Sequence, residues 1–580
     1  MAVEKLIVDH IDTWTTALQT RSTAGRGSSG KIDLYGIKKL RELILELAVR
    51  GKLVPQDPND EPASVLLERI AAEKAELVKQ GKIKKQKPLP EISEEEKPFE
   101  LPAGWEWVRL GTLFNSIQSG GTPSKINPAF WGGDIPWASV KDLGSSQYIS
   151  KTQDYITEAG LLSGSKLADS GDVLICTRMG LGKIAIASCP IAFNQDLKAV
   201  KLTSHIIPNF FFNTYSTVKI KGTGTTVEGI KQEQLVNYIT GFPPFNEQNK
   251  IVVKVKELMS LCDQLEQHTL TSLDAHQQLV ETLLTTLTDS QNADELAENW
   301  ARISKHFDTL FTTEASIDAL KQTILQLAVM GKLVPQDPND EPASELLKRI
   351  AQEKAQLVKD GKIKKQKPLP PVNDEDKLFE IPFNWEHVYL NDICEVITDG
   401  THQTPKYTDR GRPFISAQCV KPFKFMPENC RYVSEEDYQQ YIKNRTPEIN
   451  DILLARVGAG IGECAVIDVN LEFSIYVSTA LIKPIKCHIN SNYLCLWLNS
   501  PIGRLFSSHY TYGKGVSQGN LNLSLIRTFV ISIPPYKEQN LIVEKVRTYL
   551  SICEKLKSKI QSAQQTQLHL ADALTEVAIN

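Results

Sequence analysis

Two glycine-rich segments have spacings that could bind a phosphate group. Gly25–Lys31 imitates a phosphate-binding loop, but Ile32 stands where Ser or Thr would bind Mg²⁺, and no buried strand precedes it. Gly458–Gly462 reads G-x-G-x-G, lacks the third glycine position of a dinucleotide-binding turn, and is flanked by short apolar runs. We interpret the first segment as a flexible linker and the second as a hairpin turn.

Two proline pairs imitate the catalytic loop of enzymes that methylate exocyclic amines. That loop reads Asn/Asp-Pro-Pro-Phe/Tyr, because its first side chain must hydrogen-bond the amine and free the nitrogen lone pair for attack. Here the loops read Phe242–Phe245 and Ile533–Tyr536, and neither Phe nor Ile can make this hydrogen bond. Both segments are therefore interpreted as structural corners between a strand and a helix.

Other catalytic chemistry has no better support. The ten histidines include no H-E-x-x-H pair, and the ten cysteines include no C-x-x-C pair, so we expect reduced core thiols, no metal site and no disulfide framework. No catalytic triad is evident either. We expect a chain that binds rather than catalyses, with no catalytic, cofactor-binding or metal-binding residue of its own.

The composition is typical of a globular protein, with 41% apolar residues and a net charge of −4. No apolar run approaches the roughly 20 residues of a membrane helix. The segment Met1–Trp14 carries acidic residues inside its apolar stretch, unlike a secretory signal. We expect a cytoplasmic protein without a membrane partner, and any DNA-binding face must be a local cluster of Lys and Arg.

The chain is a tandem duplication. Residues 47–90 and 327–370 are identical at 38 of 44 positions, at an offset of 280. A second matched block begins at Pro243 and again at Pro534, at an offset of 291. The stretch Gly51–Ser64 recurs letter for letter at Gly331–Ser344, which indicates either a face presented twice to identical partners or a recent duplication or gene conversion.

Between the matched blocks lie two variable modules, residues 105–242 and 385–533. They share sparse landmarks, such as Asp172–Arg178 beside Asp451–Arg456, and glycine-rich segments near Gly222 and Gly513. Short apolar runs bounded by Gly, Asp and Asn predict short strands and tight turns. Each module has roughly 140 to 150 residues, enough for one mixed α/β domain. The runs expected as strands are 173–176, 184–187, 452–454 and 465–467.

Apolar residues recur at three- and four-residue steps after each proline pair, which predicts long amphipathic helices. The central helix is expected from about 247 to 287, and an apolar stripe of that length needs a partner helix. The repeat predicts a pseudo-twofold frame in which the matched parts bind two copies of one partner and the variable parts recognise two different things. It also predicts that the two termini lie close together on one half of the frame.

The order of these motifs, which occurs twice in the chain, resembles that of the specificity subunit of a type I restriction-modification system. The resemblance extends from Ile37 to about Ala571. The resemblance rests on the module entries Glu100–Trp105 and Glu380–Trp385, the Asp-Val-Leu-Ile strand, the glycine-rich segments, and the exits Pro243–Gln248 and Pro534–Gln539. It implies a non-catalytic DNA-binding subunit with an α/β (α+β) fold: two mixed α/β target-recognition domains separated by long helices that form an antiparallel coiled coil. The domains expected are an N-terminal helical region and linker (1–98), target-recognition domain 1 (99–245), a central helical region (246–378), target-recognition domain 2 (379–536) and a C-terminal helix (537–580).

The resemblance also implies partners and cofactors. The two domains would each bind one half of an asymmetric, bipartite site in double-stranded DNA. Two modification subunits would dock on the frame, bind S-adenosylmethionine and methylate adenine N6. Two restriction subunits with motor and nuclease activity, using ATP and Mg²⁺, would join them for cleavage.

Polar, basic and glycine-bearing loops are the candidate DNA contacts, because Arg can pair with guanine, Gln or Asn with adenine, and backbone amides with phosphate. In the first module they are Ser119, Gly120, Gly121, Thr122, Lys125, Lys141, Arg178, Lys219 and Lys221; in the second they are Thr401, His402, Lys406, Gln418, Arg456, Tyr512, Lys514, Gln518 and Asn520. The candidate partner-docking residues belong to the repeated frame: Gly51, Lys52, Leu53, Gly331, Lys332, Leu333, Glu247, Gln248, Glu538 and Gln539.

Three alternatives stay open. The basic run Lys82–Lys87, repeated at Lys362–Lys367, is a phosphate contact, a docking segment or a solubilising linker. The whole chain is alternatively a self-contained DNA methyltransferase, although it lacks the acidic or amide residue before Pro-Pro. The third alternative is an adaptor whose modules bind proteins. Such an adaptor would show no preference for a DNA sequence in two separate parts.

Overall fold

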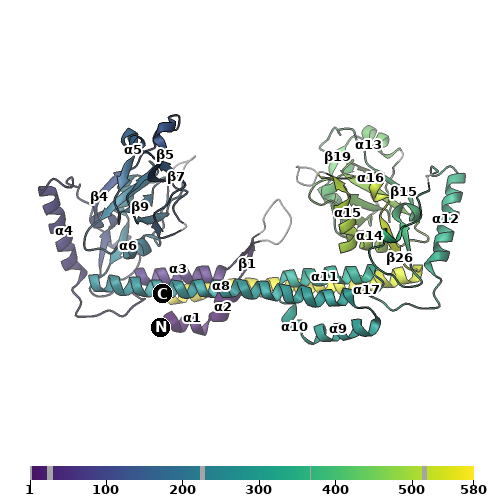
Figure 1. Ribbon diagram of the computed structural model, residues 1–580, viewed down its shortest axis with the longest axis horizontal. Helices are drawn as coiled ribbons and strands as arrows, with labels where there is room; N and C mark the ends of the chain where they lie inside the picture. Colours follow the sequence, from purple (N-terminus) through teal and green to yellow (C-terminus); the bar gives the residue numbers. More distant parts are fainter. Residues whose placement is uncertain are drawn as a thin grey trace. The chain divides into compact units, whose positions relative to one another are not determined.

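The computed structural model describes residues 3–21, 31–144, 146–222, 229–365, 368–443, 445–512 and 519–579 (Figure 1). Contacts divide the chain into two compact units. The first contains residues 1–19, 32–270 and 564–580, and the second contains residues 20–31 and 271–563. Each unit holds one module and a part of the helical frame. Two long helices, α8 (Phe245–Asp289) and α17 (Tyr536–Ile579), contribute residues to both units.

In the first unit, helix α3 (Tyr35–Val49) packs against the beginning of α8 and the end of α17. Its apolar face joins the same core as Ile251 of α8 and Ala571 of α17. At the rim Arg41 pairs with Asp263 of α8, and the Tyr35 hydroxyl donates to Asp572 of α17 at 2.7 Å. The short helices α1 (Val3–Asp9) and α2 (Ile11–Thr16) complete this part of the frame.

The second unit repeats this packing with the two long helices in exchanged roles. Helix α11 (Glu314–Val329) joins the core that contains Leu284, from the end of α8, and Val546, from the beginning of α17. Lys557 of α17 bonds Asp318 of α11 at 2.7 Å. The pairing of a beginning with an end in each unit makes the two long helices antiparallel partners, as predicted. Helices α9 (Ala293–Lys305) and α10 (Phe307–Leu310) connect α8 to α11.

The first module contains two mixed sheets with strand orders β4-β12-β9-β10-β6 and β7-β5-β11-β8. The first sheet forms because β9 and β10 are short apolar runs that are buried along their whole length. Helix α6 (Pro208–Tyr215) packs its phenylalanines into the core beneath it. The strands are β4 (Phe114–Ser119), β5 (Trp131–Ala138), β6 (Tyr148–Ile149), β7 (Asp154–Ile156), β8 (Lys166–Ala168), β9 (Val173–Cys176), β10 (Ile184–Ala187), β11 (Ile191–Phe193) and β12 (Leu197–Leu202), with helices α5 (Glu158–Gly164) and α7 (Gln232–Asn237).

The second module has the corresponding sheets in the orders β15-β23-β20-β21 and β19-β16-β22. Strand β23 pairs antiparallel with β15 and β20, as β12 does with β4 and β9. The elements are β15 (Cys394–Asp399), β16 (Arg412–Ile415), β17 (Val420–Lys421), β18 (Lys424–Phe425), β19 (Arg431–Val433), α13 (Glu435–Ile442), β20 (Ile452–Ala455), β21 (Cys464–Val466), β22 (Ser474–Ile475), β23 (Thr479–Pro484), α14 (Ser491–Asn499), α15 (Pro501–His509), β24 (Thr511–Tyr512), β25 (Asn520–Leu521) and α16 (Leu523–Ile526).

Each module enters and leaves its frame through one antiparallel strand pair. These pairs are β3 (Glu106–Arg109) with β13 (Ile239–Phe242), and β14 (Glu386–Tyr389) with β26 (Val530–Ile533). The proline pairs follow β13 and β26 directly and precede the long helices, so the predicted strand-to-helix corners are confirmed. A further helix stands beside each module, α4 (Ala63–Lys79) in the first unit and α12 (Ala343–Lys359) in the second.

The other expectations about the fold are mostly confirmed. The four predicted strand runs are β9, β10, β20 and β21, and Gly458–Gly462 lies in the antiparallel turn between β20 and β21. Both terminal segments lie in the first unit, where α1 and the end of α17 line one cavity. The segment Gly25–Gly30 lies outside the described residues. Within the described residues, no helix is long and apolar enough to cross a membrane.

Candidate nucleic-acid interface

The first module presents a polar edge where three neighbouring strands begin or end. Strand β12 is antiparallel to both β4 and β9, so its beginning lies beside the ends of the other two: Lys198 is opposite Ser119, and Leu197 is opposite Cys176. The Lys198 ammonium donates to Ser119 Oγ at 2.6 Å. Arg178, two residues past β9, is exposed at this edge.

The loop between β11 and β12 completes this edge. Thr122 Oγ1 donates to Gln195 Oε1 at 2.5 Å, and the Arg178 guanidinium lies 4.0 Å from an Asp196 carboxylate oxygen. The structure thus brings together Ser119, Thr122 and Arg178 of the predicted set. It adds Gln195 and Lys198, which we missed; the signal was a polar Asn-Gln-Asp turn directly before a strand.

Gly120 and Gly121 have a structural reason to be glycine. A Cβ on Gly120 would lie 2.2 Å from the Asn194 carbonyl oxygen, and one on Gly121 would lie 1.8 Å from that of Gly164. The segment after β4 can therefore pass close to the neighbouring backbone only without side chains. These glycines place Thr122 beside Gln195, and the Gly121 amide itself donates to the Phe193 carbonyl at 2.9 Å.

The second module builds the corresponding edge with different side chains. Strand β15 ends at Asp399, β20 ends next to Arg456, and Thr401 accepts from the amide of Val477 just before β23. His402 is exposed and its Nε2 lies 3.2 Å from Asp399 Oδ2. Of the predicted residues, His402 is exposed at this edge, whereas Thr401 lies there with only 7% of the residue exposed and does not fit the prediction of a DNA contact. Asn520 is exposed in β25, bridged to Val457.

Arg456 does not fit the prediction of a base-reading side chain. Only 6% of the residue is exposed, its Nε donates to the Leu521 carbonyl at 2.9 Å, and its Nη1 contacts Asp399 and the Val477 carbonyl. A buried guanidinium held by three partners cannot reach a base edge while these contacts persist. We infer that Arg456 instead holds the ends of β15 and β20 together through its contact with Asp399.

The remaining predicted DNA contacts that the structure describes lie elsewhere in their own modules. Gln418 is exposed, and its amide donates to the Asn429 carbonyl at 2.9 Å. Tyr512 belongs to β24, whereas Lys514 and Gln518 lie outside the described residues. The basic run Lys82–Lys87 lines a cleft beside β4 and α7 in the first unit. The lysines predicted as contacts are all exposed: Lys125, Lys141, Lys219, Lys221 and Lys406.

The repeated frame residues form a buried polar node at the base of each module. In the first unit, the Trp105 indole donates to Glu247 Oε2 at 2.9 Å. The Gln56 amide donates to Glu247 Oε1 at 3.1 Å and to the Gly51 carbonyl at 2.6 Å. Gly51 has a φ of +67°, and a Cβ there would lie 2.4 Å from Pro102. The loop, the module entry and α8 thus meet at one carboxylate.

The second unit repeats this node contact for contact. The Trp385 indole donates to Glu538 Oε2 at 3.0 Å, and the Gln336 amide donates to Glu538 Oε1 at 3.1 Å. The neighbouring glutamine is used in the same way in both copies: Gln248 accepts from the Ile207 amide at 3.0 Å, and Gln539 accepts from the Asn490 amide at 2.8 Å.

The partner-docking prediction does not fit the four residues Glu247, Gln248, Glu538 and Gln539. Their exposed fractions are 2%, 0%, 2% and 0%, because each is enclosed between a long helix and a module. Gly51 and Gly331 are also buried, and Leu53 and Leu333 pack on their cores. The repeat is therefore explained in part by an internal attachment that each copy must keep.

Lys52 and Lys332 also act within their own units, at the ends of the long helices. The Lys52 ammonium donates to the Ile579 carbonyl of α17 at 2.6 Å. Lys332 donates to the Thr288 carbonyl at 2.6 Å and the Ser290 carbonyl at 2.9 Å, at the end of α8. Carbonyls at a helix C-terminus lack intrahelical donors, so these lysines satisfy them and complement the helix dipole.

The carboxyl groups of Glu247 and Glu538 should make the stability of the protein depend on pH. Burial raises the pKa of Glu247 and Glu538 above their ordinary value of 4.5, despite the hydrogen bonds from Gln and Trp. A pKa that is higher in the folded state means that folding favours the protonated glutamate. The contribution of this proton to the free energy of unfolding is fully present below the unfolded-state pKa, and it is lost as pH rises through the folded-state pKa. We expect the stability advantage of wild type over Glu538→Gln to shrink as pH rises from 4.5, measured by denaturant unfolding at a series of pH values. A constant or growing difference would contradict this.

Comparison with known proteins gives the family. The model of the type I restriction modification DNA specificity domain matches residues 102–275 and 382–563. The chain is 48% identical to the type I restriction enzyme EcoAI specificity subunit of Escherichia coli and 47% identical to the EcoEI specificity subunit of the same organism, covering 100% of both chains in each case. The solved HsdS subunit from Thermoanaerobacter tengcongensis has 18% identity and a TM-score of 0.38, over 83% of this chain and 98% of that one. The chain therefore belongs to the family of type I restriction-modification specificity subunits.

Proposed function

We propose that this specificity subunit reads a bipartite, asymmetric site in double-stranded DNA, one half with each module. The observation that carries the proposal is the pair of corresponding strand-end edges. Both are built by corresponding strands, β4, β12 and β9 in the first module and β15, β23 and β20 in the second, yet one presents Arg178, Gln195 and Lys198 and the other presents His402. Two edges with the same backbone arrangement but different hydrogen-bonding side chains are suited to two half-sites of different sequence.

The side chains of the first edge suit base reading. An exposed Arg can donate two hydrogen bonds to guanine O6 and N7, and Gln can pair with adenine N6 and N7. Asp196 lies beside Arg178 and orients it without burying it. Lys198, Lys219 and Lys221 add positive charge that suits phosphate contacts.

The proposed partners are two modification subunits, which would bind S-adenosylmethionine and methylate adenine N6, and two restriction subunits, which would use ATP and Mg²⁺. The buried node leaves other repeated positions for docking. Pro55, Asp57 and Asn59 are exposed, as are their counterparts Pro335, Asp337 and Asn339. We propose these exposed turns as the surface presented twice to the modification subunits.

The experiment that tests half-site reading is Arg178→Ala, assayed with the modification subunits on DNA carrying single base changes. We expect discrimination to fall by about 1–3 kcal/mol at one base pair of one half-site, with the other half unchanged. Arg69→Ala removes an equally exposed arginine from α4 and is the matched control.

Three results would contradict the proposal. Uniform weakening on all sequences would make Arg178 a phosphate contact. Tight, stoichiometric binding of S-adenosylmethionine by the isolated chain would instead support a self-contained methyltransferase, and binding without a split sequence preference would support an adaptor.

A further inference from the structure

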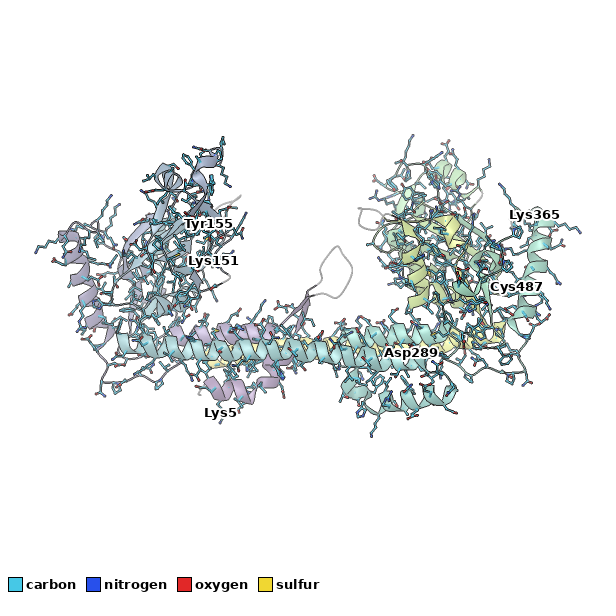
Figure 2. The ribbon with its side chains drawn as sticks, in the orientation of Figure 1. Lys5, Lys151, Tyr155, Asp289, Lys365 and Cys487 are labelled. Carbon is cyan, nitrogen blue, oxygen red and sulfur yellow. The ribbon has the colours of Figure 1, made fainter. Side chains whose placement is uncertain are left out.

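Three side chains of the second unit that commonly bind transition metals converge between α12 and the loop after β23. Cys487 Sγ donates to Glu353 Oε2 at 2.8 Å, and His488 Nε2 lies 3.3 Å from the same oxygen. Sulfur, imidazole nitrogen and carboxylate oxygen all lie within 4.8 Å of one another. Cys487 is exposed and lies beside α12 in Figure 2, so solvent can reach the cluster.

The corresponding position of the first unit, beside α4, holds different side chains. There Glu73 of α4 accepts from Ser204 Oγ at 2.7 Å and from Asn115 Nδ2 at 2.7 Å, with His205 Nε2 at 3.8 Å. The next residues of the two helices also correspond: Lys74 donates to the Gly111 carbonyl at 3.0 Å, and Lys354 donates to the Asn391 carbonyl at 2.6 Å. Both helices are thus attached to their modules at equivalent points.

The two copies differ at this point in a consistent direction. Ser204 is replaced by Cys487, and Asn115 is replaced by Glu395, one residue into strand β15 as Asn115 is in β4. Both changes replace a neutral hydrogen-bond donor with a side chain that can bind a cation. Burial, Glu353 and, more weakly, the charge of Glu395 raise the pKa of the Cys487 thiol to about 11, which accounts for its S–H donating to Glu353.

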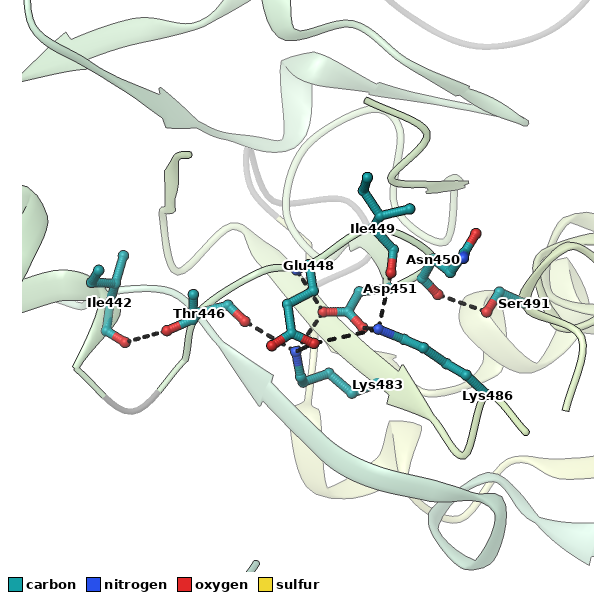
Figure 3. A network of polar contacts seen from close by, with 9 residues as sticks. All are labelled: Ile442, Thr446, Glu448, Ile449, Asn450, Asp451, Lys483, Lys486 and Ser491. Atoms are coloured by element: carbon teal, nitrogen blue, oxygen red, sulfur yellow. Dashed lines mark hydrogen bonds and ion pairs between the residues drawn. The ribbon is translucent and has the colours of Figure 1, made fainter. Parts of the chain in front are cut away.

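The nearby lysines have carboxylates of their own. Lys483 and Lys486 both bond the buried Asp451, at 2.7 Å and 2.8 Å, and both contact Glu448 (Figure 3). Their charges are therefore balanced within this network. Glu353 accepts from the thiol, and the charge of Glu395 acts on it more weakly.

We propose that Glu353, Cys487 and His488 bind one Zn²⁺, with Glu395 or water as the fourth ligand, and that the ion fastens α12 to the second module. Cysteine sulfur, histidine nitrogen and carboxylate oxygen are the ligands of protein zinc sites, which are almost always tetrahedral. A thiolate and an imidazole select against Mg²⁺ and Ca²⁺, which prefer all-oxygen sites. On binding, the S–H bond breaks, the proton leaves to solvent and a sulfur–zinc bond forms.

The test uses the full-length chain, stripped of metal with a chelator, and titrated with Co²⁺ and with Zn²⁺. We expect one equivalent of Co²⁺ to give a thiolate-to-cobalt charge-transfer absorption that Zn²⁺ abolishes. Cys487→Ser should lose this absorption and bind Zn²⁺ more than about 100-fold more weakly. Zn²⁺ should raise the midpoint of thermal unfolding of wild type but not of Cys487→Ser.

The first unit supplies the control for folding, because a serine already occupies the position of Cys487 there. Cys487→Ser should therefore unfold at the wild-type midpoint in chelator. Cys430→Ser removes another partly exposed thiol of the same module and should keep the cobalt absorption. Equal Zn²⁺ affinity in wild type and Cys487→Ser, or loss of the absorption in Cys430→Ser alone, would overturn the proposal.

Discussion

A chain in which residues 385–533 are replaced by a second copy of residues 105–242 should, with the proposed modification subunits, methylate an inverted repeat of one half-site. Each module is attached to the beginning of one long helix and the end of the other, so exchanging the roles of α8 and α17 relates the two attachments. Because the two attachments are equivalent, we expect two identical modules to read the same bases on opposite strands. Sequencing the methylated adenines gives the target directly.

The junctions of this replacement are favourable. Trp105 and Trp385 both donate to a glutamate of a long helix, and both modules leave their frame just before a proline pair. We expect mismatches in either half of the new site to cost about 1–3 kcal/mol per base pair, as in the parent site.

Exchanging the two modules is the matched control for this experiment. We expect the exchanged chain to recognise the parent duplex unchanged, because the two attachments are equivalent and turning the DNA end for end restores every contact. A direct repeat as the target of the duplicated chain, or a changed duplex target after the exchange, would show that the modules do not read DNA through equivalent positions.

The fold could be predicted from the sequence where the spacing of apolar residues and the internal repeat indicate the same element. The buried strands β9 and β20 are short apolar runs after an aspartate and glycine or asparagine, and α8 and α17 carry long apolar stripes after proline pairs. The family confirms that the chain is the non-catalytic specificity component, as predicted from the absent acidic or amide residue before Pro-Pro.

The candidate site was predictable only in part. Arg178 and Arg456 were both predicted as arginines of polar, basic loops. Arg178 is exposed, whereas the guanidinium of Arg456 is held by Asp399 and two carbonyls. Sequence cannot separate these cases, because the difference lies in the residues across the edge: Asp399 ends β15, whereas Ser119 ends β4. Gln195 was missed because its turn resembles an ordinary hairpin.

Exact repetition was also ambiguous between docking and internal attachment. Glu247 and Glu538 lie in the first turn of long helices, where a carboxylate is usually exposed. A tryptophan that recurs with each glutamate, 142 and 153 residues earlier, was the available sign of a buried pair. Each tryptophan reaches its glutamate only because β3 pairs with β13 and β14 pairs with β26, and no local sequence pattern specifies these strand pairs.

Removing one node carboxylate should loosen one unit and leave the other unchanged. In Glu538→Ala, the buried Trp385 indole N–H loses its acceptor and Gln336 loses one of three. We expect the free energy of unfolding of the second unit to fall by about 2–4 kcal/mol, from one unsatisfied donor and a weakened loop. Hydrogen exchange should show faster exchange in the segments 331–336 and 386–389, with 51–56 and 106–109 unchanged.

Glu247→Ala should give the mirror result, with faster exchange at 51–56 and 106–109 only, because its node is made of Trp105 and Gln56. Lys537→Ala changes the residue next to Glu538 but removes only an exposed ammonium, 3.2 Å from Asp340, and should leave exchange at the node unchanged. Equal loosening of both units by either glutamate variant would mean that the nodes do not act separately. No loosening by either would mean that burial of the modules' apolar faces, rather than this shared carboxylate, attaches them to the frame.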